Sequence, residues 1–203
     1  MILLPAAVPL LLLLLVALLV VFVVLVELRI LSYAYRKIGI APRHVFAILV
    51  LTLLGSHVNI PLYSVPAGRA ARVTVVAVNV GGALIPALLS LYLFLRMPTR
   101  GRMVIGTAVV AVVVNQLARV VPGVGVVVPM LLPPLLAAAV ALILAFRRAP
   151  PVAYVAGTMG ALIGADLLNL GRVAEMGAPM VSIGGAGTFD GVFLTGILAG
   201  LLA

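Results

Sequence analysis

The stretch PAAVPLLLLLLVALLVVFVVLV, residues 5–26, contains no charged and no hydrogen-bonding side chain. A helix needs about 20 consecutive apolar residues to cross a bilayer, and this stretch has the required length. It lacks the basic segment and the small-residue cleavage site of a secretory signal. We therefore expect a first membrane span that stays in the protein.

The chain as a whole is also strongly apolar. Of the 203 residues 66% are apolar and only 8% are charged, whereas ordinary soluble domains carry roughly 25% charged residues. This composition excludes a water-soluble globule. We expect a single transmembrane domain over residues 1–203, passing several times through the cell membrane, with membrane lipids as its surroundings.

Charged residues, prolines and glycines divide the chain into apolar segments of about membrane-spanning length. We predict an all-α transmembrane bundle with seven spans, at about 5–26, 44–62, 73–95, 103–120, 126–146, 151–170 and 179–203. The prolines between residues 122 and 134 predict a broken helix there.

The chain carries a net charge of +9, and the distribution of its Lys and Arg residues predicts the orientation. With the N-terminus outside, nine of the 13 Lys and Arg residues fall in cytoplasmic connections and four in outer ones. Short loops rich in Lys and Arg stay in the cytoplasm, so we predict N-out and C-in. The basic residues are scattered beside apolar stretches, where they contact headgroups, so we expect no nucleic-acid partner.

Two stretches of the sequence resemble each other. Residues 78–83 read VNVGGA and residues 181–186 read VSIGGA. Both lie in predicted spans that run in the same direction through the membrane. The similarity predicts a parallel repeat of two three-helix units joined by a fourth span, a 3-1-3 arrangement of the kind found in some transporters.

Asp166 and Asp190 lie inside predicted spans, where an ionisable side chain costs at least ~2.5 kcal/mol and usually marks a functional site. Each is 12 residues from Ala178, in a predicted turn. If both arms are helical, both residues lie ~18 Å from the turn. We therefore expect them at one depth, in the outer half of the membrane.

The preceding hairpin repeats this spacing. His57 and Asn79 are each 11 residues from Gly68, which predicts that they join the two aspartates in a polar layer. For His57 taken alone, a structural hydrogen-bonding role is the stronger interpretation. Cross-helix hydrogen bonding is likewise the simpler interpretation of Asn59, Asn115 and Asn169.

Glycines surround this layer. Those at 157, 160, 164 and 171 share one helical face, with a GxxxG step that lets a neighbouring helix approach closely. Asp166 is about 200° around the helix from Gly164, so it should point away from that face. Residues 182–191, SIGGAGTFDG, hold too much glycine for a robust helix, and we expect an unwound segment lining a cavity.

Two carboxyls that meet in a low dielectric cannot both ionise easily, so the pair holds one proton. An aspartic hydrolase uses this state: one carboxylate activates water while the other carboxyl polarises the scissile carbonyl. The glycine-rich strand can bind an extended peptide by strand addition. The structural alternative is a pair of protonated carboxyls that only pack.

The last two predicted spans resemble the GxGD aspartic intramembrane proteases, the presenilin and signal-peptide-peptidase group. Those enzymes carry one catalytic Asp in a helix and the second after Gly-x-Gly in the next span. Here Asp166 corresponds to the first, and Gly185-Ala186-Gly187 precedes Asp190. The resemblance implies an intramembrane aspartic endopeptidase whose substrate is a membrane-embedded peptide.

A larger part of the chain resembles an uncharacterised prokaryotic membrane family, domain of unknown function 1614. The stretches that carry the resemblance are Gly55 to Tyr63, Asn79 to Tyr92 and Gly184 to Gly191. This family implies no established activity.

The expected site has three parts. The catalytic residues are Asp166 and Asp190; the substrate-binding residues are Gly184, Gly185, Gly187, Thr188 and Asn79; and the secondary polar residues are His57 and Asn169. Two Asp and one His from separate spans match no recognised metal-ligand spacing, so we expect neither a metal nor another cofactor.

The alternative function is a proton- or cation-coupled transporter of a small solute. Seven spans with N-out topology are similar to the small sugar transporters of the SWEET type. In this interpretation the same two aspartates bind the ion, and Asn79, Asn115 and Asn169 line its path. A transporter would show solute uptake that depends on pH, whereas a protease would produce a cleaved peptide.

Overall fold

The structure, a computed structural model, describes residues 4–67, 72–123, 125–185 and 191–203. It divides into two compact units, Met1–Tyr33 and Ala34–Ala203. The first helix, α1 (Leu4–Lys37), contributes residues to both units. The two units are described separately below.

The first unit is helical, and its described apolar side chains are exposed from Leu12 to Val26. The segment Leu12–Lys37 has 26 residues, and its most apolar 18-residue window has no buried residue. At about 1.5 Å per residue it is about 39 Å long, enough to cross a hydrocarbon core of about 30 Å. The first predicted span is therefore a helix suited to a membrane.

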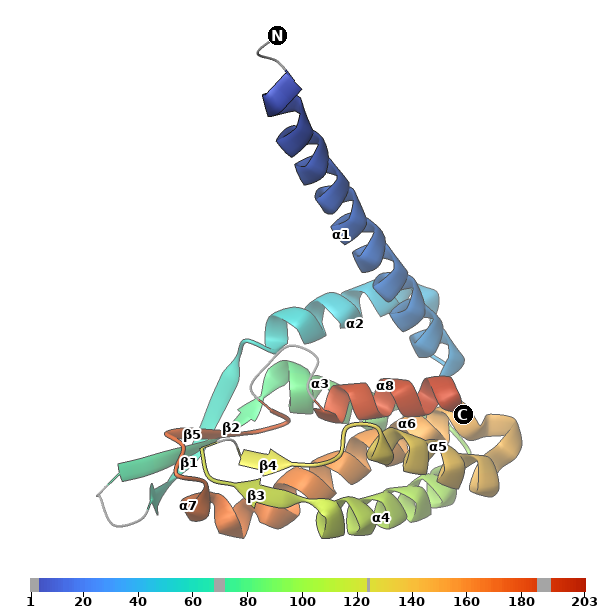
Figure 1. Ribbon diagram of the computed structural model, residues 1–203. Coiled ribbons are helices and arrows are strands. Elements are labelled where there is room, and N and C mark those ends of the chain that lie inside the picture. The colour runs from blue at the N-terminus through green and yellow to red at the C-terminus, as the bar shows by residue number, and fades with distance from the viewer. Residues whose placement is uncertain (1–3, 68–71, 124, 186–190) are drawn as a thin grey trace. The chain divides into compact units, whose positions relative to one another are not determined.

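The second unit is mostly helical (Figure 1). Its α-helices after α1 are α2 (Pro42–Gly55), α3 (Ile85–Arg96), α4 (Arg100–Leu117), α5 (Leu132–Ala145), α6 (Ala149–Ala161), α7 (Val173–Met176) and α8 (Gly191–Leu202). Shorter helical turns are η2 (Val80–Leu84), η3 (Phe146–Arg148), η4 (Leu162–Asp166) and η5 (Leu167–Arg172), of which η2 and η4 are π-helical.

Two small sheets correct the expectation of an all-α fold. Strands β1 (Asn59–Ala67) and β2 (Arg72–Asn79) form an antiparallel hairpin, and β5 (Met180–Ile183) pairs with β2 in parallel. Strands β3 (Arg119–Val121) and β4 (Gly125–Val127) form a second hairpin between α4 and α5, where we had predicted a broken helix. The β-branched residues of RVTVVAVN in β2 favour extended backbone.

The seven predicted spans are not supported. Among the described residues two stretches, Leu12–Lys37 and Leu132–Met176, are long and apolar enough to cross a membrane. The second contains α5 and α6, which pack against each other and turn at η3. Several expected spans are part helix and part strand: α2 leads into β1, and β2 leads through η2 into α3. Hydropathy measures how apolar a segment is and not its backbone conformation. Each helix and its neighbouring strand were therefore predicted as one span.

Small residues line the centre of the second unit. Helix α6 packs against α3, α4, α5 and α8, and its alanines at 149, 153, 156 and 161 are buried. Large apolar side chains instead face outward, among them Ile143 (83% exposed) and Phe146 (79% exposed). Small residues between helices and large ones outside are typical of packing in membranes, which supports a membrane protein.

The predicted glycine face of α6 is present in part. A Cβ at Gly160 would lie 2.6 Å from Val110 Cβ, and one at Gly164 would lie 2.4 Å from the Ala111 carbonyl oxygen. Both contacts are with α4, so the GxxxG step is where that helix approaches. A Cβ at Gly171 would have no described neighbour within 4 Å, so this glycine does not take part.

The two similar stretches lie side by side in β2 and β5. Val78 pairs with Ile183, and Ala77 pairs with Ser182. The strands then end in glycine pairs that touch: a Cβ at Gly82 would lie 1.9 Å from the Gly184 carbonyl oxygen. The similarity therefore reflects a local strand-and-glycine packing, while the 3-1-3 repeat of whole helices is not supported.

Candidate functional site

Asp166 is the last residue of the π-helical turn η4, which continues α6. A π-turn shifts the backbone hydrogen bonds of a helix, and such turns are frequent at functional sites. The Gly164 carbonyl oxygen accepts hydrogen bonds from Asn115 Nδ2 and Asn169 Nδ2, both at 3.1 Å. Asn169 Nδ2 also donates to the Ala165 carbonyl oxygen at 3.0 Å. These two amides therefore hold the backbone that carries Asp166.

The Asp166 carboxylate contacts the end of β5. Its Oδ2 accepts a hydrogen bond from the backbone N–H of Gly184 at 2.7 Å. Gly184 and Gly185 have φ angles of +80° and +75°, which glycine adopts without strain, and they turn the chain where β5 ends. The predicted unwound segment was residues 182–191, and its described residues 182–185 are not helical, as expected.

This contact shows that the arm after the turn does not have the helical rise that we assumed, while Asp190 itself lies outside the described residues. Asp166 is 12 residues from Ala178 along helical backbone, a rise of about 18 Å. Gly184 is only six residues from Ala178, but a strand rises about 3.3 Å per residue and so covers about 20 Å. Because the arm after the turn begins as a strand, the residue level with Asp166 is Gly184.

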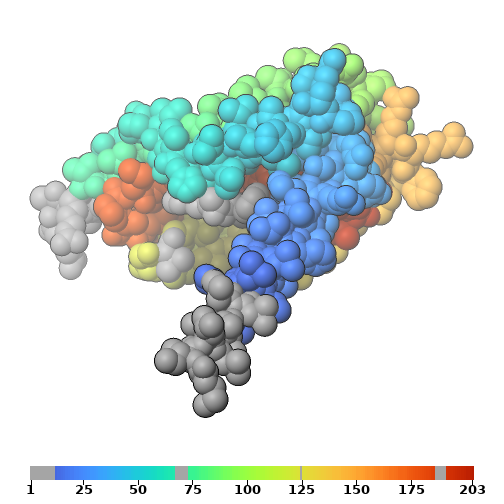
Figure 2. Space-filling model, turned by 90° about the horizontal axis from the view of Figure 1, so that it is seen from above, coloured from blue at the N-terminus to red at the C-terminus, as the bar shows by residue number. Residues whose placement is uncertain are grey.

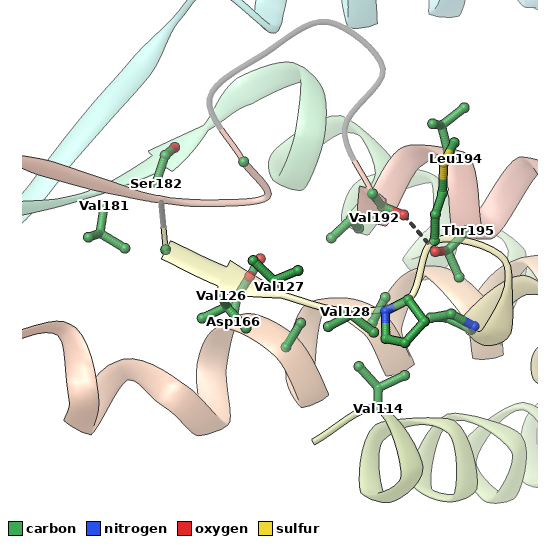
Figure 3. Close-up of a pocket in the computed structure, with 18 of the residues that line it drawn as sticks. Val114, Val126, Val127, Val128, Asp166, Val181, Ser182, Val192, Leu194 and Thr195 are labelled. Carbon is green, nitrogen blue, oxygen red and sulfur yellow. Dashed lines mark hydrogen bonds between the residues drawn. The ribbon is translucent and has the colours of Figure 1, made fainter. Parts of the chain in front are cut away.

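Asp166 lines a cavity of about 440 Å³ between α6, α8, β4 and β5 (Figure 3). Ser182 and Gly185 border it from the β5 side, and Val126 borders it from β4. Thr195 of α8 adds a further polar side chain to the lining, and Gly191 borders the cavity at the start of the same helix. Most of the remaining lining is aliphatic, so the cavity combines one carboxylate with apolar walls.

Asn79 is fully buried beside this site rather than in the cavity. Its Oδ1 accepts a hydrogen bond from Gly82 N at 2.7 Å, and its Nδ2 donates to the Ser56 carbonyl oxygen at 2.7 Å. It also donates to Asn59 Oδ1 at 3.1 Å. Asn79 thus ends β2 and starts the π-turn η2, which is a structural role, and the substrate-binding role assigned to it stays a prediction.

His57 is not brought to the aspartate. It is exposed, and its Nδ1 lies 3.3 Å from Ser56 Oγ and 3.2 Å from the Leu53 carbonyl oxygen. The arms of its hairpin are strands that pair Asn59 with Asn79. Asn59 therefore takes the position level with Asn79 that we had assigned to His57.

Two polar residues near the site were missed as site candidates, Asn59 and Ser182. Ser182 Oγ donates to Asn59 Oδ1 at 2.6 Å, which links β5 to β1 across β2. The sequence carried a signal for Ser182, because it occupies the position of Asn79 when VSIGGA is aligned with VNVGGA.

The other predicted site residues, Gly187, Thr188 and Asp190, lie outside the described residues. The chain on either side of them is described. Gly185, which precedes this segment, and Gly191, which follows Asp190, line the same cavity as Asp166.

No curated protein and no solved structure matches the chain significantly. A family model described as "Protein of unknown function (DUF1614)" matches residues 53–202. The match covers β1, β2, α3 to α8 and the whole cavity. With three quarters of its length matched, the chain belongs to the DUF1614 family.

Proposed function

We propose that this protein is a multi-pass intramembrane aspartic protease, oriented N-out and C-in, in which Asp166 and Asp190 share the general acid and base roles. The observation that carries the proposal is the position of Asp166. Its carboxylate lines a largely apolar cavity that is also lined by Gly191, the residue after Asp190.

In the proposed reaction one carboxylate takes a proton from water as the water oxygen bonds to the scissile carbonyl carbon. The other, protonated carboxyl donates its proton to the carbonyl oxygen. The tetrahedral intermediate, now a gem-diol, then breaks its C–N bond, and the leaving nitrogen takes up the proton that the first carboxyl holds. As the C=O bond re-forms, the second carboxylate takes the proton from one of the two hydroxyl groups. The products are a carboxylic acid and an amine, and the pair again holds one proton.

The sheet supports a peptide as substrate. Strand β5 lies at the edge of the order β1-β2-β5, and within the described residues no further strand pairs with it. Three of its four residues, Met180, Val181 and Ser182, line the cavity. An exposed strand edge binds extended peptides through main-chain hydrogen bonds. A peptide added here would pass beside Asp166, with apolar side chains against the cavity walls.

The test uses full-length protein in liposomes with a membrane-embedded peptide, and mass spectrometry detects the fragments. Asp166→Asn and Asp190→Asn should each lower cleavage by about 10²–10⁴-fold, the usual contribution of general acid–base catalysis. The control is Glu175→Gln, which removes a carboxylate from an exposed ion pair with Arg172 and should leave cleavage unchanged. Cleavage that survives both aspartate substitutions would exclude the proposal.

The transporter alternative uses the same aspartates and is separated by the same preparation. It requires solute uptake driven by a pH or cation gradient, without peptide fragments. Asn79, Asn115 and Asn169, which that alternative places along the path, donate their amides to backbone carbonyls or to Asn59. We therefore favour the protease.

A further inference from the structure

Strand β5 uses only one of its two edges to pair with β2. The N–H of Val75 donates to the Pro179 carbonyl oxygen at 3.0 Å, and Val75 is the register partner of Met180. In a parallel pair such a residue bonds to the two neighbours of its partner and not to the partner itself. The main-chain N–H and C=O of Met180 therefore point away from β2. The two-residue period of a strand gives Ser182 the same orientation.

The N–H of Gly184 continues this outward series. It follows the N–H groups of Met180 and Ser182 in the same alternation, and it donates to Asp166 Oδ2 at 2.7 Å. The carboxylate oxygen thus occupies the position at which a neighbouring strand would place a carbonyl oxygen. Within the described residues no strand pairs with this edge of β5. Asp166 therefore takes the place of one carbonyl of a strand neighbour.

The outward edge borders the cavity that Asp166 lines. Met180 and Ser182 line this cavity, and Val126 and Val127 of β4 form another part of its wall (Figure 3). In the space-filling view the orange-red segment around α7 lies between the β1–β2 hairpin and the yellow segment around β4 (Figure 2). An unpaired N–H or C=O in apolar surroundings is costly. Such an edge therefore favours a ligand that brings main-chain groups of its own.

We propose that an extended peptide pairs with the outward main-chain groups of Met180 and Ser182, and that its next carbonyl oxygen takes the Gly184 N–H from Asp166. This carbonyl is the one that is cleaved, so the inference deepens the proposed function and rests on it. The Gly184 N–H stabilises the negative charge that develops on the carbonyl oxygen during attack. Asp166 Oδ2 then accepts the proton of the attacking water.

This register defines the substrate class. One peptide residue donates its N–H to the Met180 carbonyl oxygen, and the cleaved carbonyl lies further along the edge, opposite Gly184. Counting along paired strands places that residue two before the cleaved carbonyl in a parallel peptide and four after it in an antiparallel one. Proline has no N–H. The substrate is therefore an extended segment without proline at that position.

The experiment uses the full-length Asp190→Asn protein in neutral detergent, in which cleavage is switched off and Asp166 is the only aspartate. Aspartate that is isotopically labelled at its carboxyl carbon then gives one NMR signal, from Asp166. The probe is a blocked hydrophobic peptide of leucine, valine and threonine with a fluorescent label, which reports the affinity. We expect saturation with this peptide to shift the Asp166 signal, because the carboxylate loses the Gly184 hydrogen bond.

Met180→Pro, made in the same protein, tests the edge. Proline is tolerated at the first residue of a strand, and Met180 begins β5. The substitution removes one outward N–H and keeps the bonds to β2, so affinity should fall about two- to tenfold, the effect of one neutral hydrogen bond. Met180→Leu keeps the N–H and a similar side chain, and as the matched control it should leave the affinity unchanged.

N-methylation of the peptide, one residue at a time, repeats the test without any change in the protein. Because only every second N–H of an added strand faces β5, methyl groups at alternate residues should weaken binding. This series does not depend on the folding of a variant. Weakening without any alternation along the peptide would contradict strand pairing.

The remaining outcomes also decide the proposal. A peptide that binds without shifting the Asp166 signal would overturn it, as would equal affinities for the Met180→Pro and Met180→Leu proteins, or no binding at all. Cleavage by the protein with Asp190 intact is scored separately. Binding with the expected signatures but without fragments would keep the peptide site and exclude the protease. Fragments whose yield is insensitive to N-methylation at both positions given by the register would keep the protease and exclude the role of Gly184.

Discussion

Asp166 Oδ2 accepts a hydrogen bond from the Gly184 N–H at 2.7 Å, and this bond joins the π-turn after α6 to the end of β5. It is the point at which the helical and sheet parts of the second unit meet in the cavity. The carboxylate thus has a structural contact in addition to its proposed catalytic role. A substitution that keeps the hydrogen-bond acceptor but removes the acid group, compared with one that removes both, can distinguish the structural contact from the catalytic role.

We predict that Asp166→Asn folds with nearly the stability of the natural protein, because the amide oxygen can accept the Gly184 hydrogen bond. Asp166→Leu leaves that N–H without an acceptor and should lower the free energy of unfolding by about 1–3 kcal/mol. The chain has no tryptophan, so thermal unfolding in detergent is followed by circular dichroism. Equal melting temperatures for the two variants would contradict the structural role of this bond.

Gly82→Ala should be strongly destabilising, by about 1–3 kcal/mol or more. The new Cβ would lie 1.9 Å from the Gly184 carbonyl oxygen, and backbone cannot move aside as a flexible side chain can. Gly171→Ala is the matched control, since a Cβ there has nothing within 4 Å. Thermal unfolding of both variants checks the prediction, which fails if Gly82→Ala melts with the control.

Asn115 and Asn169 should behave as a coupled pair. Each donates to the Gly164 carbonyl oxygen, so a single substitution by alanine leaves that oxygen one side-chain donor, whereas the double substitution removes both side-chain donors. The double variant should lose more unfolding free energy than the sum of the two single losses, by at least about 0.5 kcal/mol. A double-mutant cycle from urea unfolding measures this coupling, and strict additivity would show that the two amides act independently.

The predicted orientation can be tested by cysteine labelling, because the chain contains no cysteine of its own. Arg172→Cys and Arg147→Cys each introduce one thiol, on sides of the membrane that the excess of cytoplasmic Lys and Arg makes opposite. A membrane-impermeant maleimide added to intact cells should label position 172 and not position 147. The reverse pattern would invert the topology, and labelling of both from outside would contradict the multi-pass arrangement.

Sequence reasoning located the parts of the site that depend on residue type alone. The glycines that follow β5 depart from helix as expected, since positive φ angles at Gly184 and Gly185 suit glycine. The contact of Gly160 and Gly164 with α4 also follows from the GxxxG spacing. Both are local properties, so they can be recognised without knowing where the chain goes next.

The partners of Asp166 and Asn79 could not be obtained in this way. Both were placed by counting residues on helices, but the strands beside them advance about twice as far per residue. Gly184 and Asn59 therefore lie where Asp190 and His57 were expected by the count. The choice between strand and helix in these valine-rich segments depends on the neighbouring strand and not on hydropathy.

The amino-acid sequence by itself determined that this protein is built for apolar surroundings, because the shortage of charge and the apolar run of residues 5–26 are properties of composition. It also determined which acids stand out, since an aspartate amid aliphatic residues is conspicuous wherever it packs. Only the tertiary structure decided which groups face Asp166. Register between β2 and β5, and the asparagines that hold the π-turn, bring together residues far apart in the chain, and such non-local contacts leave no periodic trace in the sequence.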